Sequence, residues 1–256
     1  MLGWWRRRRW RRLRAQPFPP SWVAIVERNV PFVRRLPEAD RRELEGHVLV
    51  FLAEKSFEGC GGLELDDEVR VTIAAQACVL LLHREADYFP RVSSVLVYPS
   101  GYVTPDEEEL PDGTVVAGED LRDGESWDSG AVVLAWDASL AGAVGPRDGD
   151  NVILHEFAHQ LDQASGEADG LPPLPRRSMY RTWAEVCARE FAALERAAER
   201  GRPTVLDPYG AEHPAEFFAV ATEAFFERSG ELRRRHPELY ALLREYYCQD
   251  PAELEG

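Results

Sequence analysis

The chain has 256 residues, with 45 acidic against 30 basic side chains and a formal net charge of −15 at pH 7. That charge is typical of a soluble protein and argues against direct nucleic-acid binding. No run approaches the ~18 apolar residues of a transmembrane helix. The four scattered cysteines form no C-x-x-C pair and favour a reducing compartment. The basic start lacks the apolar core of a secretory signal. We therefore expect a cytoplasmic protein.

The first residues differ sharply from the rest. The stretch MLGWWRRRRWRRLR contains seven arginines and no acid. Tryptophans interleaved with cations suit anionic lipid or nucleic acid. Terminal charge runs usually remain mobile, so we predict a disordered basic tail over residues 1–16. Residues 17–256 are then predicted to form a single domain.

The hydrophobic pattern changes its period twice along that domain. A helical period precedes a strand-like alternation over residues 93–138, and a helical period returns after it. This order predicts an α+β fold. Helices are predicted near residues 21–34, 37–55, 66–87, 151–162, 177–200, 214–228 and 236–247. Strands are predicted near 57–65, 95–98, 114–117 and 131–137, with a turn at Asp112-Gly113.

The sequence NVILHEFAHQLD contains His155, Glu156 and His159 in an H-E-x-x-H arrangement. Residues four apart lie on one face of a helix, so both imidazoles can reach one metal ion. Zn²⁺ suits such a pair, and Glu156 can accept a proton from the water at the metal. The alternative is a solvent-facing helix with two ordinary histidines. It fits poorly, because apolar residues surround the motif and predict a buried helix, with Asp150 as a plausible N-cap.

Two histidines and a water leave one protein ligand to find. The downstream candidates are Asp162, His213, Glu216 and Glu223. Asp162 starts a turn too far along its helix and is better placed to hold His159 or a neighbouring group. Glu216 and Glu223 share one face of an apolar helix, where a carboxylate needs a cation or an arginine. The residues alone leave the choice open.

Several segments resemble the Mlc titration factor A family of bacterial zinc peptidases: HEFAHQLD, GEADGLPPL, DPYGAEHPAEFFAVATEAFF, SVLVYPS, AVVLAWD and LREYYCQDP. The likeness covers roughly residues 20–252, and the Trp/Arg tail departs from it. It implies a zincin-type core, similar to the anthrax lethal factor protease, with a small mixed sheet and additional helices. It further implies that His155, His159 and Glu216 bind Zn²⁺ and that Tyr209 stabilises the oxyanion.

The resemblance also implies a cytoplasmic, aminopeptidase-type activity and binding of the glucose-responsive repressor Mlc. We therefore predict a zinc metallopeptidase acting on a peptide or protein, with Glu156 as general base and then as proton donor to the leaving amine. The strand at 131–137 is expected to offer its edge to an extended substrate. One rival hypothesis is a repressor-binding regulator with secondary peptidase activity. Another is a lipid- or nucleic-acid-associated protein that works through the basic tail.

Overall fold

The computed structural model describes residues 2–85, 87–109, 115–122, 124–127, 130–145 and 147–254. The predicted Asp112-Gly113 turn lies outside these residues. The helices are α1 (Leu2–Arg14), α2 (Pro20–Asn29), α3 (Glu38–Glu54), α4 (Asp67–Val79), α5 (Trp136–Val144), α6 (Val152–Asp162), α7 (Met179–Ala198), α8 (Pro214–Glu227), α9 (Ser229–Arg235) and α10 (Pro237–Tyr247). Short 3₁₀ turns are η1 (Pro31–Arg35), η2 (Gln163–Ser165), η3 (Pro208–Ala211) and η4 (Pro251–Leu254).

The main sheet is small and mixed, as predicted for the α+β class. Its order is β1 (Ser56–Gly59), β2 (Ser94–Tyr98), β6 (Ala131–Ala135) and β5 (Gly124–Trp127). The first three strands are parallel, and β5 runs antiparallel to β6. A separate antiparallel pair is formed by β3 (Tyr102–Glu109) and β4 (Val115–Arg122).

The expectation that strand 131–137 offers its edge to a substrate is wrong. This strand is β6, and it pairs with β2 on one side and β5 on the other, so its backbone groups are already used. It also ends at Ala135, because Trp136 begins α5. The edge strand next to β6 is β5.

The expectation of a disordered tail is also wrong. Residues 2–14 form α1, which packs against α3. Arginine and leucine are good helix formers, and Trp10 supplies the apolar contact that a short helix needs. The Trp10 side chain is only 6% exposed, and its ring meets that of Tyr88 at a centroid distance of 4.7 Å. The buried apolar side chains form one cluster from Trp10 to Ala252, so this helix shares its core with the rest of the described chain.

Two of the predicted helices end earlier than expected. Pro31 ends the predicted 21–34 helix, and η1 replaces its last turn. The helix predicted to reach Asp87 stops at Val79, and a positive φ at His83 follows in the next turn. The predicted C-terminal helices are present as α7, α8 and α10, with the short α9 between the last two.

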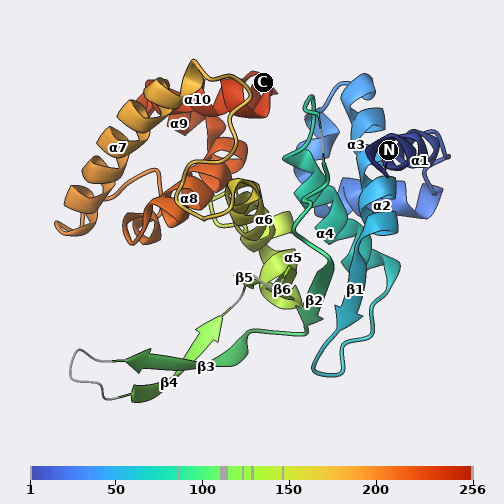
Figure 1. Ribbon diagram of the computed structural model, residues 1–256, viewed down its shortest axis with the longest axis horizontal. Helices are drawn as coiled ribbons and strands as arrows, with labels where there is room; N and C mark the ends of the chain where they lie inside the picture. Colours follow the sequence, from blue (N-terminus) through green and yellow to red (C-terminus); the bar gives the residue numbers. More distant parts are fainter. Residues whose placement is uncertain are drawn as a thin grey trace.

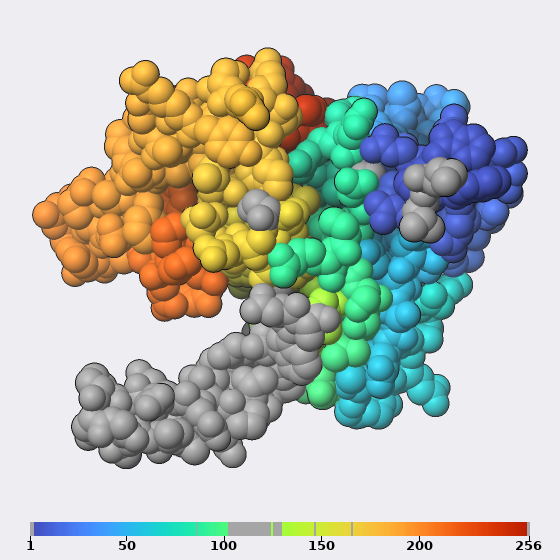
Figure 2. Space-filling model, viewed as in Figure 1, coloured from blue at the N-terminus to red at the C-terminus, as the bar shows by residue number. Residues whose placement is uncertain are grey.

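Helix α6 occupies the centre of the molecule (Figure 1). The sheet and α4 lie on one side of it, and α8 packs along the other. Its inward residue Phe157 is fully buried, with ring contacts to Phe51 and Phe89 at 5.5 and 4.8 Å between centroids. Figure 2 shows the segment after α6 (yellow) between the N-terminal half and the C-terminal helices. The H-E-x-x-H motif therefore lies on a largely buried helix.

Among the described residues, no helix has both the length and the apolar character needed to cross a membrane.

Candidate metal centre

Backbone N–H groups at the start of α6 donate hydrogen bonds to two side chains, those of Asn151 and Glu223. Asn151, rather than the predicted Asp150, is the N-cap, and its side-chain oxygen accepts a hydrogen bond from Leu154 N at 3.1 Å. The backbone N–H of Asn151 in turn donates to Glu223 Oε1 on α8, at 2.6 Å. This contact ties the start of α6 to α8, so the two helices that carry the motif and its candidate ligands are joined.

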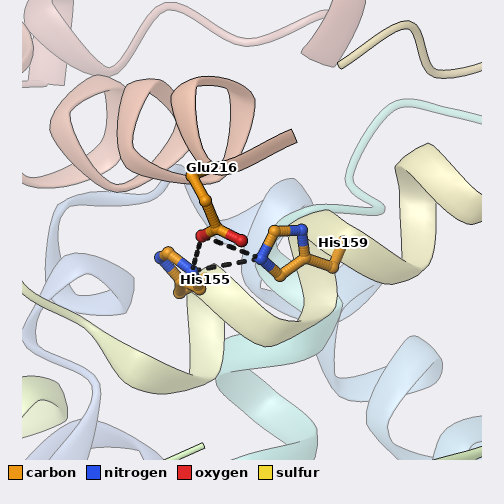
Figure 3. Close-up of side chains that lie close together, drawn as sticks. All are labelled: His155, His159 and Glu216. Atoms are coloured by element: carbon orange, nitrogen blue, oxygen red, sulfur yellow. Dashed lines mark hydrogen bonds and ion pairs between the residues drawn. The ribbon is translucent and has the colours of Figure 1, made fainter. Parts of the chain in front are cut away.

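The three predicted metal ligands lie close together in the structure. His155 Nε2 lies 3.0 Å from Glu216 Oε2, and His159 Nε2 lies 3.3 Å from the same oxygen. The two Nε2 atoms are 3.1 Å apart. Figure 3 shows the two imidazoles on α6 and the carboxylate on α8 pointing toward one another. The three side chains could therefore share one cation.

The other downstream candidates have different roles. His213 is the N-cap of α8, where its Nδ1 accepts a hydrogen bond from Ala215 N at 3.2 Å. Asp162 is fully buried, and its Oδ2 accepts from Gly170 N at 2.7 Å. It therefore holds the loop that follows α6. Glu223 approaches the far side of a motif histidine, with 2.9 Å between Glu223 Oε2 and His155 Nδ1.

The donor set fits a zinc ion. Two imidazole nitrogens and one carboxylate oxygen leave a fourth tetrahedral position open, as in catalytic zinc sites. The pair of Nε2 atoms also needs a proton or cation between them, because two ring nitrogens with lone pairs facing each other repel. Burial lowers the pKa of His155, but hydrogen bonds with Glu216 and Glu223 outweigh burial and raise this pKa well above its usual value. The surroundings thus favour positive charge at this point.

Glu223 is placed to orient the His155 ring. Its side chain is only 4% exposed, so protein groups must satisfy its oxygens. The contact with Nδ1 directs Nε2 of the same ring toward Glu216 and His159. A carboxylate behind a ligating imidazole fixes both its tautomer and its direction.

Glu156 lies beside the three-residue cluster but outside it. Its side chain is buried, and Oε2 has no hydrogen-bond partner in the described part of the chain. Burial raises the pKa of Glu156. Gly124 on β5 packs directly against it, since a Cβ there would come within 2.7 Å of Glu156 Oε1. A buried carboxylate with an available oxygen at this point is suited to proton transfer.

Tyr209 belongs to η3, just before α8. The Asp207 side chain begins this turn by accepting a hydrogen bond from Tyr209 N at 2.8 Å. The Tyr209 ring centroid is 6.0 Å from that of His155, and the side chain is 48% exposed. Tyr209 therefore lies beside His155 on the solvent side of the three-residue cluster, where a substrate could contact it.

The sequence reasoning missed two residues beside this site. Glu227, one turn after Glu223, accepts hydrogen bonds from Asn151 Nδ2 at 2.9 Å and Gly149 N at 3.1 Å. Its spacing on the α8 helix was a signal that pointed to the same face. Gly124 gave no such signal, because its approach to Glu156 arises only when β5 joins the sheet.

The chain matches one protein-family model and several bacterial relatives. The model of the family described as "Glucose-regulated metallo-peptidase M90" matches residues 2–248, so the match includes α1. A Synechocystis protein designated slr2042 is 46% identical over 92% of this chain and 86% of its own length. Mlc titration factor A of Pectobacterium atrosepticum is 31% identical over 90% of this chain and 86% of its own length. Mlc titration factor A of Escherichia fergusonii is 31% identical over 91% of this chain and 87% of its own length.

These matches define the protein as a metallopeptidase. The chain belongs to the M90 family of glucose-regulated metallopeptidases. The predicted resemblance is confirmed, and it extends to the N-terminal helix that seemed to depart from the family pattern.

Proposed function

We propose that this protein is a zinc-dependent peptidase in which His155, His159 and Glu216 hold the ion. The observation that carries the proposal is the convergence of these three side chains from two helices at mutual distances of 3.0 to 3.3 Å. When bound, a zinc ion polarises the scissile carbonyl and lowers the pKa of a water molecule toward 7. Family membership supports a metal-dependent reaction.

The chain's own residues would handle the protons and the orientation. Glu156 takes the proton of the attacking water at Oε2, the atom with no hydrogen-bond partner among the described residues. It then returns this proton to the leaving amine, a role that a buried carboxylate with a raised pKa performs well. Tyr209 donates to the oxygen of the tetrahedral intermediate from the solvent side of the cluster.

The substrate would lie along the edge of the sheet nearest Glu156. Strand β5 is the last strand in the sheet order, and its Gly124 packs against Glu156. An extended peptide can pair with such a strand through backbone hydrogen bonds. Small aminoacyl and peptide substrates are the first to test, because the family resemblance implies an aminopeptidase-type activity.

The ligand assignment is tested by the zinc content of Glu216→Ala, Glu223→Ala and His213→Ala. Only Glu216→Ala should lose most of its metal after purification, since the other two residues do not belong to the cluster. Substrates should be screened with and without a chelator. Retention of zinc in Glu216→Ala together with its loss in His213→Ala would contradict the assignment.

A second candidate function is binding of an Mlc-like transcriptional repressor in the cytoplasm. It is favoured by the relatives named Mlc titration factor A, which align with nine-tenths of this chain. The catalytically impaired Glu156→Gln variant separates the two functions. If repressor binding is the main function, this variant should still capture a purified Mlc-type repressor with wild-type affinity. No capture by either protein would exclude this function.

A further inference from the structure

The outer face of helix α1 consists of Trp4, Trp5, Arg8, Arg11 and Arg12. These positions repeat every three to four residues and therefore share one side of the helix. Trp4 and Trp5 are 55% and 62% exposed, and the three arginines are exposed as well. Two adjacent exposed tryptophans form an apolar patch, and exposed apolar patches on soluble proteins often mark interaction sites.

The opposite side of α1 is anchored to the protein. Arg9 forms an ion pair with Glu54, and Arg6 forms one with Asp87 at 3.4 Å. Arg14 Nε donates to the Tyr88 hydroxyl at 2.7 Å. The helix is thus held in a fixed orientation, and its outer face is presented to solvent.

The outer arginines differ from the anchored ones in their partners. Within the part of the chain that the structure describes, Arg8, Arg11 and Arg12 take part in no ion pair, although the protein carries an excess of acid. The Arg8 guanidinium lies 5.6 Å from the Trp4 ring centroid. Their charge is therefore available for an anionic partner.

A hollow behind the helix extends this basic surface. It has a volume of about 420 Å³ and is lined by Trp4, Trp10 and the four arginines Arg7, Arg11, Arg14 and Arg84, with two acids, Glu85 and Asp87. Arg11 belongs to both the outer face and the hollow. An anionic group bound at the outer face can thus interact with cations on two sides.

We propose that the outer face of α1 docks the protein on a bilayer surface rich in anionic phospholipid. Tryptophan favours the boundary between headgroups and acyl chains, and arginine binds the headgroup phosphates. An amphipathic helix with aromatic and cationic side chains on one exposed face lies in that boundary. The peptide-bond chemistry proposed above is independent of this docking.

The charge distribution favours a membrane over a nucleic acid. The net charge of −15 repels a long polyanion that would contact several faces of the protein. A flat bilayer can touch α1 alone, and repulsion then orients the acidic remainder away from the surface. In Figure 1, α1 lies on the opposite side of the molecule from α7 and α8, so docking leaves Glu216 and its helix away from the lipid.

The test is co-sedimentation of the full chain with vesicles. Phosphatidylcholine vesicles containing one third phosphatidylglycerol are compared with pure phosphatidylcholine vesicles in low salt. The test variant carries Arg8→Glu, Arg11→Glu and Arg12→Glu. The matched control, called the α7 control, carries Arg196→Glu near the end of α7 and Arg200→Glu and Arg202→Glu just after it. These three exposed arginines give the same change in net charge.

We expect binding only to the anionic vesicles, weakened in 0.5 M salt because screening removes the attraction. The α1 charge reversal should weaken binding by at least about a hundredfold, since each arginine near an anionic surface contributes about fivefold. Trp4→Ala with Trp5→Ala should also weaken it. The α7 control should bind like wild type. Circular dichroism and hydrolysis of a soluble peptide should be unchanged in every variant.

Three results would overturn the proposal. One is that wild type does not bind the anionic vesicles, and another is that the α7 control loses as much binding as the α1 variant. The third is tighter binding to a 30-base-pair DNA duplex than to the vesicles in the same salt, which would assign the face to nucleic acid. If the wild-type protein hydrolyses no peptide but still binds the anionic vesicles, the proposed peptidase function is wrong and the docking proposal is unaffected.

Discussion

The contact between Glu223 and His155 makes a quantitative prediction about metal affinity. Glu223 accepts hydrogen bonds from Asn151 N at 2.6 Å and from the His155 ring at 2.9 Å. In Glu223→Gln, the single amide oxygen can retain only one of these two bonds. Because the site is buried, no water replaces the other. A lost charge-assisted hydrogen bond costs about 1.5 to 3 kcal/mol.

That cost corresponds to a zinc Kd about ten- to a hundredfold weaker, the range observed when a group behind a metal ligand is removed. The assay is competition for Zn²⁺ between the apo-protein and a fluorescent chelator at neutral pH. Zinc content after purification should remain near one per chain, because all three proposed ligands are still present.

Glu227→Gln is the matched control for this experiment. It makes the same chemical change one turn further along α8. Its contacts are with Asn151 Nδ2 and Gly149 N. None of its described contacts is with His155, His159 or Glu216. Its zinc Kd should equal that of wild type. An unchanged Kd in Glu223→Gln, or an equal loss in Glu227→Gln, would refute the idea that Glu223 acts through the His155 ring.

Three further predictions concern catalysis and pH. Glu156→Gln should keep full zinc occupancy while turnover falls by about a hundredfold or more, because an amide cannot accept the proton; metal analysis with a peptidase assay checks this. Tyr209→Phe should lower kcat about ten- to a thousandfold with unchanged zinc content, and unaltered kinetics would remove the phenol from the mechanism. Burial raises the pKa of Glu227 from 4.5 to about 8. The folded state then binds the extra proton between these values, so this group's stabilisation is complete below pH 4.5 and is lost as pH rises toward 8. Thermal melts of wild type and Glu227→Gln should therefore diverge across this window, with the variant relatively more stable at pH 8; parallel curves would show that Glu227 does not titrate in this way.

The sequence by itself determined the local parts of the candidate site. His155, Glu156 and His159 are placed by helix geometry alone, since an i, i+4 spacing puts two imidazoles on one face wherever the helix lies. The apolar residues around them were sufficient to predict that this helix is buried. The α+β class followed in the same way from changes in hydrophobic period along the chain.

Local patterns failed where a distant partner decides the outcome. Residues 2–14 resemble a mobile tail in composition, but Trp10 finds Tyr88 and α3, and this packing stabilises a helix that is marginal alone. Strand β6 resembles any other buried strand. Its interior position depends on β5, which the sequence pattern did not reveal.

The third side chain of the cluster was likewise a matter of tertiary structure. The motif and Glu216 are separated by about sixty residues, and the chain between them forms a loop and the whole of α7. Only the packing of α6 against α8 brings Glu216 to the imidazoles and sets Glu223 behind one of them. Sequence spacing fixes what lies on one helix face, whereas the side-by-side contact of two helices depends on how the whole core packs. That is why the residues alone left the last ligand open, and why the assembled fold selects Glu216 as its candidate.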